Sequence, residues 1–169
     1  MRLQFDRRQA NFAGFAACGA LLAAALFFQY VLHQTPCNMC ILQRIAVGAL
    51  GLVFLAAALH RPGNVGARVY GALHAITAIA AAALSARHVW MQLQPPGSLP
   101  SCGADFYTML DMLPVHEVVA RIVMGGGECQ AIGWSLLGLS MPAWLLLAET
   151  GLGILGVGAN VVLPRRRRS

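Results

Sequence analysis

Four long apolar stretches constrain this chain more strongly than any other feature of its sequence. They span about residues 12–31, 41–59, 69–91 and 143–163. Because a helix needs roughly 20 apolar residues to cross a bilayer, each stretch is long enough for one crossing. Hydrophobic residues make up 58% of the chain and charged residues only 11%, which nearly excludes a water-soluble domain. The sequence therefore predicts an all-α membrane protein in which residues 1–169 form one domain, a bundle of four transmembrane helices.

The arginines predict how these helices are oriented. All twelve basic residues are arginine, and nine of them flank the apolar stretches on one side of the membrane. Those nine are Arg2, Arg7, Arg8, Arg61, Arg68 and Arg165–Arg168. Since basic residues are enriched on the cytoplasmic side of membrane proteins, both termini are expected in the cytoplasm. A run of arginines beside a crossing is the ordinary cytoplasmic flank, so we expect no nucleic-acid partner.

The opposite side of the membrane is expected to hold a short loop and a long loop, of about residues 32–40 and 92–142. The long loop begins with several prolines and continues, over residues 106–124, with apolar residues at near-helical spacing. This pattern predicts a short amphipathic helix that lies on the membrane surface.

Four of the five cysteines fall in these outer loops, which is typical of an oxidising compartment. They are Cys37, Cys40, Cys102 and Cys129, whereas Cys18 lies within the first apolar stretch and is expected to be a packing residue. Cys37 and Cys40 form a Cys-x-x-Cys motif at the start of the second helix. The N-terminus of a helix stabilises a thiolate through its dipole and its unpaired backbone donors, which favours redox chemistry at this motif.

Two polar residues are predicted at the depth of this motif. Arg44 follows Cys40 by four residues, so it lies on the same helix face about one turn deeper. A cation inside the apolar layer is unfavourable unless it is compensated, which indicates a functional role; the alternative is a side chain that extends to the headgroups. His88, near the outer end of the third helix, is expected at the same level, where it could donate a hydrogen bond to a small ligand.

Three other uses of these residues are less favoured. His74 and His88 lie on one helix, but haem would need matching histidines on a facing helix. Zinc could take four cysteines, yet Cys102 and Cys129 are 27 positions apart rather than in a second Cys-x-x-Cys, and no metal is expected. Purely structural disulfides would not need a Cys-x-x-Cys, whose small ring is strained and easily reduced.

Thiol-disulfide exchange between two cysteine pairs can pass electron pairs along the chain. The electrons must then leave, and the sequence has no dinucleotide-binding motif and no soluble domain for a flavin. An apolar acceptor dissolved in the bilayer would meet Cys40, Arg44 and His88 at one depth. A quinone fits these requirements, with Arg44 stabilising both the Cys40 thiolate and the negative charge that develops on the ring.

The sequence contains a set of motifs that occur together: Pro36-Cys37-Asn38-Met39-Cys40-Ile41-Leu42-Gln43-Arg44, His88, the loop cysteines Cys102 and Cys129, and Gly138-Leu139-Ser140-Met141-Pro142-Ala143-Trp144. With these motifs the chain resembles the bacterial disulfide bond formation protein B (DsbB) family over almost its whole length. The resemblance implies a bacterial inner-membrane protein whose redox loops face the periplasm. It also implies that the chain reoxidises a periplasmic thioredoxin-like dithiol oxidase of the DsbA type and reduces ubiquinone or menaquinone of the membrane pool.

The resemblance also implies roles for individual residues. The partner's thiolate attacks Cys102, whose disulfide mate is Cys129. Cys37 and Cys40 form the redox pair next to the quinone, and Cys40 forms a charge-transfer complex with the ring. The implied quinone-binding residues are Arg44, His88 and Met141. Two features depart from the family pattern: Cys18 is an additional cysteine, and the segment Gly125–Gly127 is unusually glycine-rich. The glycines would suit a flexible loop in which Cys129 moves towards Cys37 or Cys40 during exchange.

Three alternatives compete with this interpretation. A vitamin K epoxide reductase-like protein also joins a loop cysteine pair to a Cys-x-x-Cys, but here the Cys-x-x-Cys comes first in the chain. A paralogue dedicated to a specialised partner would share every motif. A membrane scaffold held by disulfides would leave the buried Arg44 unexplained.

Overall fold

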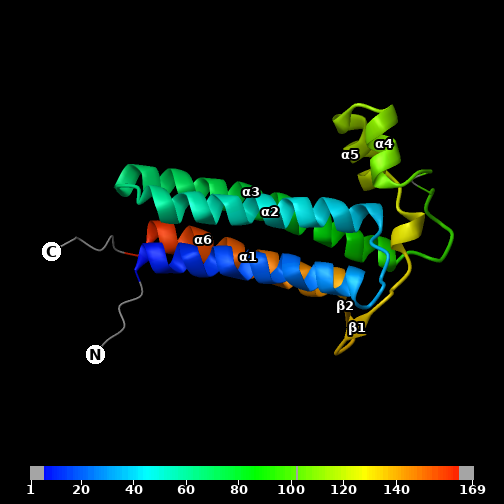
Figure 1. Cartoon of the computed structure of the whole chain (residues 1–169), viewed down its shortest axis with the longest axis horizontal. Coiled ribbons are helices and arrows are strands. Elements are labelled where there is room, and N and C mark those ends of the chain that lie inside the picture. The colour runs from blue at the N-terminus through cyan, green and yellow to red at the C-terminus, as the bar shows by residue number, and fades with distance from the viewer. Residues whose placement is uncertain (1–5, 102, 164–169) are drawn as a thin grey trace.

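The computed structural model describes residues 6–101 and 103–163. Its long helices are α1 (Arg7–Tyr30), α2 (Asn38–His60), α3 (Asn64–Gln92) and α6 (Met141–Val161). They lie side by side as a bundle (Figure 1), and each is long and apolar enough to cross a membrane. The prediction of an all-α membrane protein with four spanning helices is confirmed.

Capping residues make some helices begin earlier in the chain than the apolar stretches do. Asp6 precedes α1, and its carboxylate accepts from the backbone N–H of Gln9 (2.8 Å). The backbone N–H of Asp6 in turn donates to the Gln9 side chain (3.1 Å). This capping box satisfies two backbone donors that the start of a helix leaves unpaired. The start of α2 likewise directly follows Cys37, whose sulfur caps its first turn.

Glycines allow α3 and α6 to pack closely along their length. A Cβ atom added at Gly153 would lie only 2.7 Å from the Cβ of Ala78, and one added at Gly156 would meet the ring of His74. Small residues let helix backbones approach in a membrane, where apolar burial alone does not drive association. Gly151 and Gly158, on the other faces of α6, have open space around them.

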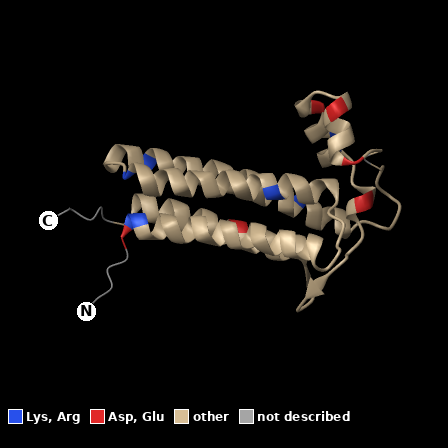
Figure 2. Cartoon of the chain, viewed as in Figure 1, with Lys and Arg blue, Asp and Glu red and all other residues tan. Residues whose placement is uncertain are grey.

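The two ends of the bundle differ in their connections. The terminal end comprises the start of α1, the α2–α3 turn and the end of α6. There Arg7 Nη2 donates to the carbonyl of Leu163 (2.9 Å), and the side chains of Asn11 and Asn160 exchange hydrogen bonds of 3.3 and 3.1 Å. The loop end carries residues 31–37, 93–101 and 103–140. Figure 2 shows that many charged residues lie near the two ends and that basic and acidic residues also lie along the bundle, among them Arg44 within α2 and Glu149 within α6.

The long loop holds two short helices rather than the single amphipathic helix predicted for residues 106–124. These are α4 (Phe106–Met112) and α5 (Val115–Met124). Leu113 and Pro114 separate them, because a residue before proline favours extended backbone. Figure 1 shows the pair standing beside the loop end of the bundle, near the start of α2.

A buried apolar cluster joins the short helices to the bundle. Its buried members are Met39, Leu42, Met91, Phe106, Met109, Val118, Ile122 and Cys129. The rest of the loop forms a 3-10 turn, η1 (Gly127–Cys129), and a small hairpin of β1 (Ser135–Leu136) and β2 (Leu139–Ser140). The cluster places η1, and with it Cys129, against the start of α2.

Candidate redox site

The Cys-x-x-Cys motif forms the first turn of α2. Cys37 is the residue before the helix, with extended backbone, and its sulfur accepts from the backbone N–H of Cys40 (3.4 Å). The two sulfurs are 3.0 Å apart. The start of a helix presents N–H groups without partners, so a sulfur anion at this position is stabilised by the backbone itself.

Cys129 reaches this turn from the long loop. Gly126 begins the approach with φ +134°, a conformation that favours glycine, and the N–H groups of Gly126 and Gly127 both donate to the carbonyl of Pro100 (3.1 Å each). A Cβ atom at Gly126 would collide with the sulfur of Met91. The glycines therefore make a tight, hydrogen-bonded turn that holds Cys129 inside the protein, with 1% of its surface exposed.

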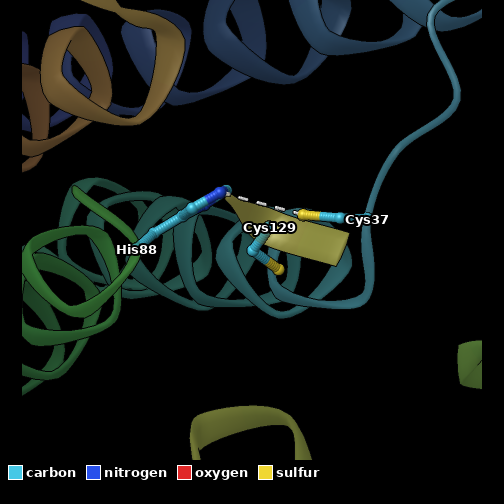
Figure 3. Close-up of side chains that lie close together, drawn as sticks. All are labelled: Cys37, His88 and Cys129. Carbon is cyan, nitrogen blue, oxygen red and sulfur yellow. Dashed lines mark hydrogen bonds between the residues drawn. The ribbon is translucent and has the colours of Figure 1, made fainter. Parts of the chain in front are cut away.

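His88 completes the cluster from α3. Its Nε2 atom lies 3.9 Å from the sulfur of Cys37 (Figure 3), and only 2% of its surface is exposed. The sulfurs of Cys37 and Cys129 and a ring nitrogen of His88 all lie within 4.8 Å of one another. Three segments far apart in the chain thus bring two thiols and an imidazole together, and Cys40 adjoins them through Cys37. Such groups can exchange disulfides, and they are also ligands that a soft metal ion accepts.

Hydrogen bonding shifts the pKa values of Cys37 and Cys129 in opposite directions. Both of these described thiols lie outside the spanning helices. Contact with Cys129, then with Cys40, raises the pKa of the Cys37 thiol, because Cys37 donates its proton to these neighbours. The same contact lowers the pKa of Cys129, which accepts from Cys37. The thiolate is thus favoured on Cys129, the sulfur that faces the Cys-x-x-Cys pair from the loop.

Arg44 lies on a different face of α2. Its guanidinium donates to the side-chain oxygen of Gln29 and to the carbonyl of Ala25 (3.1 Å), both in α1. These two acceptors compensate a cation that would otherwise be unfavourable in an apolar layer. A cavity of about 270 Å³ adjoins it. The residues that line this cavity are Gln29, Pro36, Ile41, Arg44, Ile45 and Tyr107.

The predicted site residues fall into two groups. Cys37, Cys40, Cys129 and His88 come together at the loop end, whereas Arg44 faces α1 and lines a cavity to which His88 does not contribute. Met141 begins α6 at the loop end and is also absent from that lining. Cys102, and with it the predicted Cys102–Cys129 pair, lies outside the described residues; the four described cysteines carry free thiols. The roles predicted for all these residues remain predictions.

Sequence reasoning missed a chain of buried polar side chains behind His88. The side-chain oxygen of Gln43 lies 3.2 Å from His88 Nδ1, the amide of Gln43 donates to Ser85 (2.9 Å), and Ser85 donates to Glu149 (2.7 Å). One signal was visible in the sequence, because Glu149 stands alone in an apolar stretch. Nothing in the sequence indicated which residues would pair with it.

The fold and the site together define a multi-pass membrane protein with a thiol cluster at the loop end of its helix bundle. Comparison with known proteins is consistent with this class. The family model described as "Disulfide bond formation protein DsbB" matches residues 7–159. The chain belongs to the disulfide bond formation protein B family, whose members are membrane oxidoreductases of disulfide formation.

Close relatives cover nearly the full chain. Disulfide bond formation protein B of Methylobacillus flagellatus is 44% identical over 90% of this chain and 92% of its own length. The protein of the same name from Methylococcus capsulatus is 46% identical, over 83% of this chain and 85% of its own. That of Chromohalobacter salexigens is 43% identical over 94% of each chain. Family membership decides against a vitamin K epoxide reductase-like protein, as the order of the cysteine pairs also does.

Proposed function

We propose that this chain transfers electrons from a periplasmic thioredoxin-like dithiol oxidase of the DsbA type to a membrane quinone. The observation that carries the proposal is the cluster itself. The sulfur of Cys129 lies within 4.8 Å of that of Cys37, which lies 3.0 Å from that of Cys40. Three thiols at these separations can exchange one disulfide after another with little movement of the chain.

The exchange balances as follows. The partner's thiolate attacks Cys102 of a Cys102–Cys129 disulfide, and Cys129 leaves as a thiolate. That thiolate attacks Cys37 of a Cys37–Cys40 disulfide, and Cys40 leaves as a thiolate. The partner's second thiolate then attacks its own first sulfur and releases Cys102. Cys102 attacks Cys129 of the Cys129–Cys37 disulfide, which restores the loop disulfide and releases Cys37 as a thiolate. The partner has lost two electrons, and the Cys37–Cys40 pair has gained them.

Contacts of neighbouring residues support the pairing of Cys102 with Cys129. Ser101 donates a hydrogen bond to the carboxylate of Glu128 (2.6 Å), so the residues just before the two cysteines are joined. The side chain of Asn38 donates to the carbonyl of Ala104 (3.0 Å), which ties the same part of the long loop to the start of α2.

The cavity beside Arg44 fits a quinone ring. Apolar and aromatic side chains form most of its lining, and Arg44 and Gln29 offer polar groups to ring oxygens. A quinone bound there, ubiquinone or menaquinone, supplies the final oxidation by accepting two electrons and two protons as Cys37 and Cys40 re-form their disulfide. Arg44 stabilises negative charge at the ring and at the Cys40 thiolate. His88 acts on Cys37, and Met141 stays a weaker candidate for the quinone pocket.

The direction in the membrane follows from the arginines. In the sequence, nine of the twelve lie at or before the start of α1, around the α2–α3 connection or after α6, so the terminal end is proposed to face the cytoplasm and the loop end the periplasm of a bacterial inner membrane. The thiol cluster then lies on the side where secreted proteins acquire disulfides.

Quinone reduction by the purified protein tests the proposal. A reduced thioredoxin-like dithiol is the donor, and quinone absorbance is followed for the wild type, Cys40→Ser, Cys102→Ser and Arg44→Ala. We expect turnover in the wild type, its loss in both cysteine variants, and a weaker apparent quinone affinity in Arg44→Ala. Cys18→Ala is the matched control, because Cys18 is buried between α1 and α2 away from the cluster, and it should keep turnover.

The alternatives give different results in the same assay. A scaffold held by disulfides would show no turnover with any quinone while its disulfides stay intact. A paralogue with a specialised partner would reduce quinone with one donor and fail with other thioredoxin-like dithiols.

A further inference from the structure

The chain of polar side chains behind His88 crosses the bundle from α6 to the thiol cluster. Glu149 of α6 has no exposed surface, and Ser85, Gln43 and His88 are also buried. Each link is a hydrogen bond between different helices, of 2.7, 2.9 and 3.2 Å in order from Glu149. In a protein interior such a series is directional, because each group has a limited set of donors and acceptors.

The carboxyl of Glu149 sets the direction of every hydrogen bond in the series. Its Oε2 atom accepts from Ser85 whether the carboxyl is charged or carries its proton on Oε1, which has no hydrogen-bond partner among the described residues. Ser85 has one hydroxyl proton, and its hydrogen bond to Glu149 uses that proton. Towards Gln43, Ser85 can only accept, so the amide NH₂ of Gln43 faces Ser85.

This orientation of Gln43 selects one tautomer of His88. With its NH₂ turned towards Ser85, Gln43 presents its oxygen to Nδ1 of His88. An oxygen acceptor requires a hydrogen on Nδ1, and a neutral imidazole then has its lone pair on Nε2. Nε2 is the atom that lies 3.9 Å from the sulfur of Cys37.

We propose that Glu149, acting through Ser85 and Gln43, holds His88 in the Nδ1–H tautomer so that Nε2 takes the proton of the Cys37 thiol. Glu149 is a positioning residue, since it touches neither sulfur nor acceptor. The proposal deepens the proposed function and rests on it only for the final electron acceptor.

The proton and electron balance is simple. In the step at His88 the S–H bond of Cys37 breaks and an N–H bond forms at Nε2, which gives a thiolate and an imidazolium with no change of oxidation state. When Cys37 and Cys40 then form their disulfide, two electrons pass to the quinone. The Cys37 proton passes through the imidazolium to water and the Cys40 proton also passes to water, while the acceptor takes two protons from water together with the two electrons, so the exchange balances.

Cys37 is the sulfur that needs a base. Hydrogen bonding to Cys129 raises the pKa of Cys37, so this thiol holds its proton more firmly than an ordinary cysteine and needs a base to become a thiolate. The charged and titratable groups around His88 are the cluster thiols and, through the polar chain, Glu149, and the backbone of Cys129 is a further hydrogen-bond partner of the ring. Arg87 is turned away, because its Nε atom donates to the carbonyl of Val123 (3.0 Å) and its guanidinium stacks on Trp90.

Nitrogen-15 spectra of His88 test the proposal without partner or quinone. The full chain, labelled at histidine and reduced, is placed in lipid nanodiscs, and His88 is assigned by its loss in His88→Asn. We expect Nδ1–H in the wild type and a mixture of tautomers in Glu149→Gln, whose amide allows Ser85 to donate in either direction. Ser85→Ala should also give a mixture. His74, whose Nδ1 donates to the carbonyl of Tyr70 (2.7 Å), is an internal reference that should not change.

A second readout ties the tautomer to the thiol. Alkylation of Cys37 in the reduced chain, resolved by mass spectrometry, should slow in proportion to the Nδ1–H fraction lost, by about twofold for an equal mixture. Asn160→Ala is the matched control, because it removes a buried interhelical hydrogen bond of α6 that does not lead to His88, and it should leave the Cys37 rate unchanged.

Specific results would overturn the proposal. A wild-type His88 with its hydrogen on Nε2 does so even if the variants fail to fold, and so does a single unchanged tautomer in both variants. Equal slowing in Asn160→Ala would assign the effect to packing. If the tautomer behaves as expected but no quinone is reduced, the positioning role stands and the proposed function fails.

Discussion

Gly126→Ala should loosen the turn that holds Cys129 against Cys37. Alanine at φ +134° costs about 1–3 kcal/mol of backbone strain. Its Cβ would also collide with the sulfur of Met91, which is fully buried, and crowding of a packed core costs about 1–3 kcal/mol more. A total of at least about 2 kcal/mol raises the population of the opened turn about 30-fold, since every 1.4 kcal/mol is a factor of ten.

The rate of Cys129 alkylation in the reduced chain measures this opening. Cys129 is 1% exposed, so it reacts only when the turn opens, and the rate should rise about 30-fold in Gly126→Ala. Gly138→Ala is the control, because Gly138 also has a positive φ (+78°) but open space around it and lies in the hairpin. A wild-type rate in a folded Gly126→Ala protein would refute the inference that this glycine holds Cys129 in place.

Three further predictions concern the helices and the cavity. Gly153→Leu should lower the free energy of unfolding by about 1–3 kcal/mol in SDS titrations because it crowds Ala78, whereas Gly151→Leu, with open space around it, should have little effect. Hydrogen bonds from Thr108 lower the pKa of Asp105, so the cap of α4 contributes stability above about pH 3.8 and loses it as the pH falls through the lowered pKa. Amide exchange at Tyr107 and Thr108 should therefore quicken in acid for the wild type and show no such step in Asp105→Asn. Arg44→Ala should raise the apparent quinone KM about tenfold, as loss of a charged hydrogen bond worth about 1.5 kcal/mol implies, and Arg44→Lys should raise it less.

Features that depend only on the order of residues along the chain, such as the number of spanning helices, could be predicted well. The length of each apolar stretch determines whether a helix can span a bilayer, so the four crossings followed directly from the sequence. The helix starts were less accurate, because polar or sulfur caps such as Asp6 and Cys37 lie outside an apolar pattern. The break at Pro114 was visible in the sequence, but the apolar spacing over residues 106–124 concealed it.

The candidate site depends on contacts between helices, which the sequence alone does not determine. Cys37, Cys40 and Arg44 belong to one helix, so their relative positions follow from helical geometry. The depth of His88 was also predictable, but depth does not determine the face. His88 points towards Gln43 and Cys37, whereas Arg44 points towards α1, and the packing of α3 and of α1 against α2 decides this. The link between Glu149 and His88 could be recognised only from the structure, which places Ser85 next to Glu149.

The separation of these two groups leads to a last prediction about how their contributions combine. His88 and Arg44 act on different faces of α2 and share no hydrogen-bond partner among the described contacts. Groups without shared partners contribute almost independently, whereas members of one network do not. The losses of kcat/KM in His88→Asn and Arg44→Ala should therefore multiply in the double variant.

Glu149→Gln provides the contrasting case, since Glu149 acts only through His88. In a His88→Asn background it should cause no further loss of kcat/KM, because the base that it positions is already absent. A multiplicative loss for this pair would mean that Glu149 stabilises the helix bundle and does not position the imidazole of His88. A less than multiplicative loss for His88 and Arg44 would mean that a single bound quinone contacts both, as their equal depth first indicated, and that the cavity beside Arg44 extends to His88 during turnover.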